Sequence, residues 1–412
     1  MPGTRLIGGP ELLRMREAYE RQHGRQQGWR EMARDLKGEL ERKTLTPRAF
    51  SITEMVEGLV PDSREWMDSF VKPKNSEDLF LEASDAVSTG LFFNITGQLL
   101  ITEVQEKFMD EEFVFLKAID SKPSKIVVGM ERLPGFGRIG RESQVVPEGK
   151  PYPLAGITED YIEIGAKQKR GFIVPLTREC IAADLTGELL NTAGEGAYYL
   201  GLDTEIRVID AIVDENESAA SAGQGGHRYH WKGTSYASYQ STTPWDNVTA
   251  SNALLDWSDV DNAWQTLAAI TDPYTGLPIL IQPDTMIVTS NLLWRASQVL
   301  AAVQVRNTTP GFATSANPVQ SDGPNPIRLV MGKDLTLLSS RLLGTRTATD
   351  TDWFLGNPRK AVRRYYNWDI ETSQAPADSQ ESFQRDIVTQ FKVGVRDVVS
   401  VIQPRLINKS TA

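Results

Sequence analysis

At 412 residues, the chain is longer than one small core requires, and two or three structural units are expected. Hydrophobic residues make up 40% and charged residues 24%, which excludes wholesale disorder and a fibrous repeat. The formal net charge of −10 argues against a protein that coats nucleic acid by neutralising phosphates. No run approaches the roughly 20 apolar residues of a membrane-spanning helix, and the first residues lack a signal-peptide core, so a cytoplasm-like compartment is expected.

The first residues predict a charged helical arm. Apolar residues recur at helical spacing between Leu12 and Leu40, with a polar break near Gly24, which indicates one interrupted helix or two short ones. Residues 1–45 mix ten basic with seven acidic residues, as a solvated helix does; contact with nucleic acid or an acidic partner is the alternative. Because so narrow an apolar stripe has little to pack on, we expect it to lie on another subunit or another protein.

Residues 122–176 predict an extended antiparallel hairpin. Ten Gly or Pro residues fall between Gly129 and Gly156, and the flanks KIVVG and YIEIGAKQKRGFIVPL are strand-like. The predicted glycine-rich tip projects beyond the body. A two-stranded ribbon has no core of its own, so this hairpin needs a neighbour to lie on.

The middle of the chain predicts a long buried helix followed by a compact α/β unit. Apolar groups run from Leu185 to Val213 behind a candidate N-cap, Asp184, and four glycines within the run imply close packing or a bend. Alternating aromatic residues at 230–239 predict a short hairpin or sheet appendage. The order helix, turn, strand, helix over 257–305 indicates the α/β unit.

The remaining segments predict a loop and then strands. A stretch rich in Pro, Gly and Ser at 308–326 is the best internal loop candidate, and IRLVMG and LTLLSSRLL after it are strand-like. The segment SFQRDIVTQFKVGVRDVVSVI alternates. One parity holds Ile387, Phe391, Val393 and Val395, and the other holds Gln390, Lys392 and Arg396. This pattern is typical of a strand with one buried face and one polar face.

None of the candidate chemical motifs meets its structural requirements. His227 and His230 are three residues apart where a loop enters a strand, without a Cys or a matching carboxylate pair nearby, so no metal site is expected. GFGRIG at residues 135–140 lacks a following helix and a Lys-Ser/Thr pair, which argues against a phosphate loop. The single cysteine, Cys180, is expected to be a small buried apolar residue. We therefore expect neither catalysis nor a cofactor.

The ordered set of arm, glycine-rich hairpin, long helix, α/β unit and closing strands resembles a known family. The phrases that carry the resemblance are STGLFFNITGQLLITEVQEKF, HWKGTSYASYQSTTPW, WSDVDNAWQTLAAITDPYTGLPILIQPDTMIVTSNLLWRASQVL, and DWFLGNP through FQRDIVTQFKVGVRDVVSVIQPRLI. They resemble major capsid proteins of tailed bacteriophages with the Hong Kong 97-type fold, with the branch of Mu-like head subunits suggested. The resemblance covers the chain from about residue 80 onward.

The resemblance implies an α+β fold and a division of the chain. The expected parts are an N-terminal helical arm (1–75), a helical entry to the body (76–121), an extended β-hairpin loop (122–176), a peripheral domain with a long spine helix (177–255), an axial domain (256–340) and closing strands of both domains (341–412). The hairpin would lie over a neighbouring subunit. At its tip, Arg132, Arg138 and Arg141 are expected to meet carboxylates of that neighbour; keeping an exposed tip soluble is the alternative.

The resemblance also implies a function. The chain would be a major head protein that self-assembles, as hexamers and pentamers, into the icosahedral virion shell around phage double-stranded DNA. Expected partners are further copies, a portal, scaffolding proteins and cement proteins, with DNA enclosed without sequence-specific binding, no membrane contact, and assembly in the host bacterial cytoplasm. The alternative with the same fold is an encapsulin-type compartment that encloses protein cargo; an enzyme with a dispersed site and a tail, decoration or adhesin protein are more distant alternatives.

Overall fold

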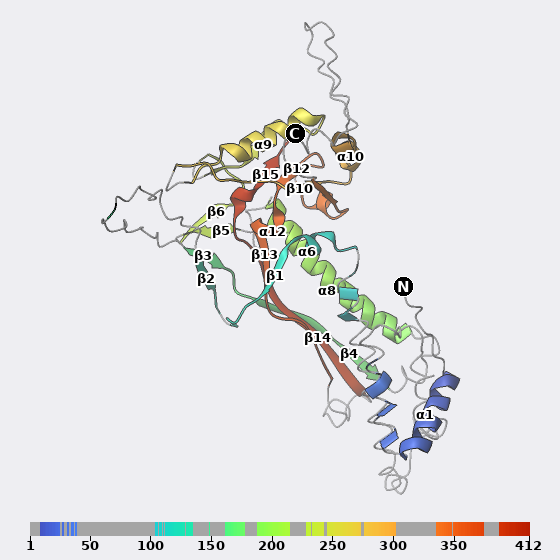
Figure 1. Ribbon diagram of the computed structural model, residues 1–412. Helices are drawn as coiled ribbons and strands as arrows, with labels where there is room; N and C mark the ends of the chain where they lie inside the picture. Colours follow the sequence, from blue (N-terminus) through green and yellow to red (C-terminus); the bar gives the residue numbers. More distant parts are fainter. Residues whose placement is uncertain are drawn as a thin grey trace, which may run out of the picture. The chain divides into compact units, whose positions relative to one another are not determined.

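The computed structural model is a mixture of helices and strands (Figure 1). It describes residues 9–24, 112–127, 129–134, 148, 161–177, 188–214, 228–231, 233–242, 245–272, 276–301, 335–347, 349–374 and 387–412, with single residues between 27 and 38 and between 104 and 110. The chain divides into two compact units. The first comprises 1–111, 169–203 and 368–395, and the second 112–168, 204–367 and 396–412. No helix in the described ranges is long and apolar enough to cross a membrane.

The second unit contains a five-stranded sheet with the strand order β11-β10-β12-β15-β9. Its strands are β9 (Val248–Thr249), β10 (Thr285–Val288), β11 (Thr336–Ser339), β12 (Trp353–Gly356) and β15 (Ile407–Ser410). β10 is parallel to β11 and antiparallel to β12, while β15 is antiparallel to β12 and parallel to β9. Every residue of β10 and β12 is buried, which explains why both segments are largely apolar rather than alternating.

Two helices complete this core. They are α9 (Trp257–Ala269) and α10 (Leu293–Ala301). α9 begins at a capping box, in which Asp256 accepts the backbone N–H of Ser258 at 2.8 Å and Asp259 accepts that of Asp256 at 2.9 Å. Ala263 of α9 and Ala296 of α10 belong to the same buried cluster as the sheet. The helix, turn, strand, helix order predicted for 257–305 is confirmed.

β12 ends in a glycine because β15 approaches it closely. A Cβ on Gly356 would lie 2.2 Å from the carbonyl oxygen of Leu406 and 2.7 Å from the Cα of Ile407. Buried amides then hold β15: Asn247 donates to the carbonyl oxygen of Ile407 at 3.0 Å, and Asn408 donates to that of Asn247 at 3.1 Å. β15 is therefore part of the core.

A separate sheet of the second unit has the order β2-β3-β5-β6. Its strands are β2 (Glu131–Pro134), β3 (Tyr161–Ile164), β5 (Arg228–Trp231) and β6 (Thr234–Ala237). β2 and β3 are antiparallel, from Glu131 opposite Ile164 to Pro134 opposite Tyr161, as predicted for the two flanks of the hairpin. β5 and β6 form the short hairpin predicted from the aromatic residues, with Gly233 at φ 78° in its turn.

Two strand predictions within 122–176 were wrong. Residues 125–127, which belong to the flank KIVVG predicted as a strand, are irregular and lie between β1 (Asp120–Pro123) and β2. β4 (Gln168–Thr177) does not continue the β3 sheet but joins a sheet of order β1-β13-β14-β4. The reason lies at residues 165–167, which are not in a strand and which bury the Lys167 side chain, so the chain changes sheets there.

β14 (Ile387–Val401) is the alternating strand predicted near the end of the sequence. It lies between β13 (Val362–Gln374) and β4 in the sheet order, and β1 pairs in parallel with β13. Phe391, Val393 and Val395 are buried, whereas Lys392 is exposed. The predicted buried and polar faces are confirmed at these residues.

The long helix predicted from 185 to 213 is present as α8 (Glu188–Val213). In the first unit its residues Ala197 and Leu200 belong to a buried cluster with Val393 and Val395 of β14. A Cβ on Gly196 would lie 2.8 Å from the ring of Phe172, so this glycine permits close packing, as predicted.

The predicted break in the N-terminal arm is present. α1 (Gly9–His23) ends just before Gly24, whose φ is +77°. The described residues after it are helical again, and Tyr19 donates a hydrogen bond to Asp35 at 2.5 Å. The partner of the apolar stripe stays a prediction. Other residues singled out in the sequence lie outside the described ranges: Arg138, Arg141, Cys180, Asp184 and His227.

Candidate functional site

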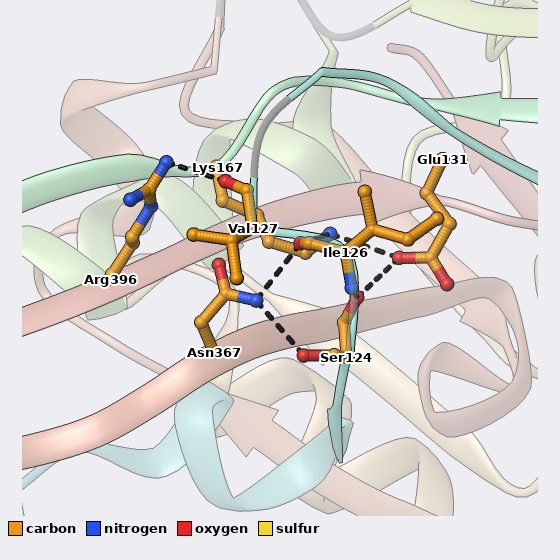
Figure 2. A network of polar contacts seen from close by, with 7 residues as sticks. All are labelled: Ser124, Ile126, Val127, Glu131, Lys167, Asn367 and Arg396. Atoms are coloured by element: carbon orange, nitrogen blue, oxygen red, sulfur yellow. Dashed lines mark hydrogen bonds and ion pairs between the residues drawn. The ribbon is translucent and has the colours of Figure 1, made fainter.

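The candidate site lies where the chain enters β2 and leaves β3. There, polar side chains bind residues 124–131 (Figure 2). β2 ends at Pro134 and β3 begins at Tyr161, directly opposite. The pairing therefore places Pro134 and Tyr161 next to each other. We call the contacts around residues 124–131 the base anchor.

Lys167 is the buried centre of the base anchor. Its side chain has no exposed surface, and its Nζ donates to the carbonyl oxygen of Ile126 at 3.1 Å and to the Glu131 carboxylate at 2.9 Å. The hydroxyl of Ser124 donates to the same carboxylate at 2.5 Å. Burying an ammonium group costs several kcal/mol unless it is paired, and Glu131 supplies the pair. Lys167 thus links the end of β3 to the start of β2.

The surrounding groups keep the Glu131 carboxylate charged at neutral pH. Burial raises the pKa of Glu131, but the Ser124 hydroxyl and the Lys167 ammonium group outweigh burial and hold the pKa below its ordinary value of 4.5. A carboxyl group with a lowered pKa in the folded state contributes stability above its unfolded pKa. This contribution is lost as the pH falls through the folded pKa.

Two further side chains bind main-chain carbonyl groups of the same segment. Asn367 of β13 donates to the carbonyl oxygens of Ser124 and Ile126, both at 2.9 Å. Arg396 of β14 donates to the carbonyl oxygen of Val127 at 2.5 Å. Because the acceptors are backbone atoms, the base anchor holds the path of the chain and leaves the side chains at 126 and 127 out of these bonds.

A buried ion cluster is centred on Asp397, which follows Arg396 of the base anchor in β14. The Asp397 carboxylate accepts from Arg207 of α8 at 2.8 Å and from Arg364 of β13 at 2.6 Å, and all three residues are at most 5% exposed. Burial alone would raise the pKa of Asp397, but the two guanidinium groups outweigh it and hold the pKa below its ordinary value. The cluster joins one helix and two strands through a single carboxylate.

The structure describes one of the three arginines predicted to contact a neighbour. Arg132 lies within β2, paired with β3, and not at the tip of the hairpin as predicted. Its guanidinium is 2.9 Å from the Glu163 carboxylate on β3 and 4.7 Å from the centre of the Tyr161 ring. Its side chain is still 66% exposed. Its role between subunits stays a prediction, as it does for Arg138 and Arg141.

The described histidine of the pair at 227 and 230 has an ordinary strand position. His230 is in β5, opposite Ser235 of β6 and Glu163 of β3. Among the described residues, no group of three His, Cys, Asp or Glu side chains is placed to hold a metal ion. The polar contacts described in this region are ion pairs and hydrogen bonds to the main chain.

Neither the base anchor nor the ion cluster was predicted from the sequence. Asp397 carried a signal, because it shares the buried parity of Phe391, Val393 and Val395, and a charged residue on an apolar face requires a buried partner. Lys167 had no such signal. It lies within the flank predicted as a strand, on the parity opposite to Ile162 and Ile164, where an exposed lysine is ordinary.

Comparison with known proteins decides the family. A family model described as "Phage capsid protein" matches residues 162–407, more than half of the chain. The chain belongs to the phage capsid protein family. No curated protein sequence matches it.

Solved structures give only distant likenesses. They include a chain from Microbacterium phage Oxtober96 (13% identity, TM-score 0.41, covering 72% of this chain and 90% of that one). The capsid of the cyanophage P-SCSP1u is 14% identical with a TM-score of 0.43, covering 73% of this chain and 88% of that one. The capsid of a native GTA particle is 10% identical with a TM-score of 0.44, covering 73% of this chain and 90% of that one. These similarities support no transfer of individual residues.

The predictions of a phage capsid protein and of a mixed helix and sheet fold are confirmed. The capsid protein is a structural protein of the virion shell and associates with further copies of itself, and the encapsulin alternative is not favoured. The Mu-like branch stays a prediction. The matched range includes Lys167, Asn367 and Arg396 of the anchor, and the three members of the ion cluster.

The anchor makes a testable prediction. Replacing Lys167 with methionine (K167M) keeps most of the stem but removes the charge, so the Glu131 carboxylate loses its ion pair. We expect a loss of about 1.5–3 kcal/mol in the free energy of unfolding, the usual value of a hydrogen bond to a charged group. Limited proteolysis should also cut faster within 124–134. Lys169→Met, an exposed neighbour, is the control and should change neither result. Equal behaviour of the two variants contradicts the anchor.

Proposed function

We propose that this capsid protein is the major head protein of a tailed phage, with the Hong Kong 97-type subunit architecture. Its copies assemble as hexamers and pentamers into an icosahedral shell around double-stranded DNA. The observation that carries the proposal is the family match over 162–407. This range spans the long helix, the α/β unit and the long strands β13 and β14. The order of these elements is the one expected for that architecture.

The proposal gives each part of the chain a role. Residues 1–75 form the arm, 76–121 the entry to the body, 122–176 the extended loop, 177–255 the peripheral domain with its spine helix, 256–340 the axial domain and 341–412 the closing strands. The extended loop lies over a neighbouring subunit. Support comes from the base anchor, which fixes the chain where this loop begins and returns.

Such a protein acts through the way its copies fit together in the shell. Each subunit touches several neighbours through repeated contacts, so modest pairwise contacts produce a stable closed shell. No catalytic step and no cofactor belong to the proposal. Its further partners are a portal, scaffolding proteins and cement proteins, and assembly takes place in the cytoplasm of the host bacterium.

The acidic composition supports a container that encloses DNA without sequence-specific binding. Tight binding to phosphates depends on clustered basic residues and counterion release. With a net charge of −10, the capsid protein lacks that excess. DNA inside such a shell stays free to be packaged and ejected.

The arginine contact yields a second prediction. In the triple variant Arg132→Glu, Arg138→Glu and Arg141→Glu, we expect a folded subunit that no longer assembles. The only described ion pair at risk, Arg132 with Glu163, is mostly exposed and contributes about 0–1 kcal/mol. Thermal unfolding checks the fold, and light scattering checks assembly. Normal shells from the triple variant would refute the proposed contact and favour a solubility role for these arginines.

Negative-stain microscopy tests the proposed function. The purified protein is imaged alone and after expression with the other head proteins of its phage. Closed icosahedral particles that contain DNA when isolated as virions support the proposal. A protein that stays monomeric under both conditions contradicts it.

A further inference from the structure

Four large apolar side chains are exposed near one end of the five-stranded sheet. Leu255 and Trp257 are 65% and 42% exposed, and Leu293 and Trp294 are 39% and 81% exposed. We call these four residues the sheet-end surface. Tryptophan is highly buried on average, and a group of exposed apolar side chains marks a contact surface.

The strand pairing brings the two pairs of exposed residues to the same end of the sheet. Trp353, the first residue of β12, lies opposite the last residues of both β10 and β15, and β9 ends beside β15. The segments that follow β9 and β10 therefore leave the sheet at one end. Arg295 links them, because its guanidinium donates to the carbonyl oxygen of Leu254 at 3.3 Å.

Carboxylates surround the sheet-end surface. They belong to Asp256, Asp259, Asp261 and Asp350. Asp259 accepts the backbone N–H of Leu255 at 2.7 Å, and Asp350 accepts from Asn291, just before α10, at 3.0 Å. All the donors to these four carboxylates are backbone, hydroxyl or amide groups. Within the described part of the chain, none of the four carboxylates is in an ion pair, so their charges stay available to a partner.

The neighbouring sequence supplies little positive charge to balance these carboxylates. Residues 233–294 contain six aspartates and no Lys, Arg, His or Glu. Arg295 follows directly and is the one cation placed at this surface by a described contact, but that contact is to a carbonyl group. Lys409 of β15 is already paired with Asp352 at 3.8 Å. The sheet-end surface is therefore both aromatic and acidic.

Such a surface fits a basic segment that also carries apolar side chains. The face of an exposed indole ring attracts an ammonium or guanidinium group, and the carboxylates add to this attraction. A second copy of this chain is a poorer match, because its net charge of −10 opposes the approach. The described arginines of its arm that form ion pairs, Arg16, Arg21 and Arg34, are already bound to glutamates.

We propose that the sheet-end surface binds a basic, partly apolar segment of a different head protein. Trp257 and Trp294 receive its Lys or Arg side chains, Leu255 and Leu293 pack against its apolar side chains, and the carboxylates attract it from a distance. The inference rests on the proposed function, because the shell is what brings other head proteins to this surface. It is separate from the contact between copies proposed for the arginines of the hairpin.

Binding of a defined peptide to the purified full chain tests the chemistry. The probe is a fluorescein-labelled peptide of alternating arginine and leucine, and the same peptide with glutamate in place of arginine is its control. Fluorescence anisotropy should show binding of the basic peptide only. Trp294→Ala should weaken that binding by about fivefold or more, the usual effect of losing a cation–π contact. Asp261→Asn should weaken it as well and reduce its dependence on salt.

Two substitutions elsewhere serve as matched controls. Leu280→Ala removes an apolar side chain that is 91% exposed, and Glu371→Gln removes an exposed carboxylate of β13. Both should bind the basic peptide like the original protein, and all four variants should unfold at an unchanged temperature. Unchanged binding by Trp294→Ala, or an equal loss in the controls, would overturn the proposal.

Photocrosslinking identifies the source of the segment. A benzophenone amino acid replaces Ser297, which is exposed about one helical turn after Trp294, in the full chain expressed with the other head proteins of its phage. We expect a crosslink to a segment of a different protein that contains Lys or Arg, and its loss in Trp294→Ala. If shells form but this crosslink is absent, or joins only a second copy or a segment without basic residues, the inference is wrong and the proposed function stands. If no shells form, the proposed function fails, and the peptide measurement alone decides the inference.

Discussion

Asp397→Ala is expected to destabilise the second unit by about 3–5 kcal/mol, the usual cost of removing one partner from a buried ion pair. The substitution leaves Arg207 and Arg364, both at most 5% exposed, without their shared carboxylate. The repulsion between these two cations adds to the loss. Urea unfolding followed by tryptophan fluorescence measures the change.

Glu371→Ala is the matched control, since Glu371 is an exposed carboxylate on β13. It should change the free energy of unfolding by no more than about 0.5 kcal/mol.

The pH dependence of stability gives a second check. The lowered pKa of Asp397 means that its contribution is complete above the ordinary pKa of 3.8 and is lost as the pH falls through the folded pKa. Asp397→Ala should therefore flatten the acid limb of the stability curve. An unchanged acid limb would show that the cluster does not stabilise the fold.

Gly356→Ala should be nearly as damaging, by about 3 kcal/mol or more, because the added methyl group meets backbone atoms that have no room to move away. Its Cβ would lie 2.2 Å from the carbonyl oxygen of Leu406 and 2.7 Å from the Cα of Ile407. β15 would have to separate from β12. On the other side of β15, Asn247 is hydrogen-bonded to Ile407 and to the Asn408 side chain of that strand, and these buried hydrogen bonds would be lost as well.

Hydrogen exchange at the amide groups of β12 and β15 measures this effect. Gly38→Ala is the control, since no atom lies within 4 Å of a Cβ at that position and the residue is helical. The control should keep full protection in β12 and β15. Full protection in Gly356→Ala would mean that the sheet tolerates a side chain there, contrary to the packing described above.

Local patterns in the sequence were sufficient for elements with one clear period. α8 and α9 follow from helical spacing, and β14 follows from its strict alternation. The change of sheet between β3 and β4 had no such signal. Ile162, Ile164, Phe172 and Val174 share one parity, so the two strands look like one continuous strand. Only the tertiary structure shows that residues 165–167 interrupt it.

Pairings between residues that are distant in the sequence could not be predicted either. β1 pairs with β13 in parallel, with Asp120 opposite Arg363, and no local pattern encodes a pairing across that separation. The base anchor is hidden for a related reason. Lys167, Asn367 and Arg396 bind main-chain carbonyl groups, which every residue possesses, so the sequence of the bound segment carries no complementary mark.

The buried ion cluster was partly visible. Asp397 occupies a position where the alternation of β14 calls for an apolar residue. That exception predicts a buried partner but does not identify it, since Arg207 is 190 residues away in the sequence. In the same way, Arg132 could be selected as a candidate contact, but its pairing with Glu163 required the register of β2 and β3.

A cryo-electron microscopy reconstruction of the assembled particle tests the central claim most directly. We expect a closed icosahedral shell in which residues 135–160 extend from an intact base anchor onto a neighbouring copy. Lys167 and Glu131 should remain paired in every subunit. A particle without icosahedral order, or subunits whose residues 135–160 pack only on their own chain, would contradict it.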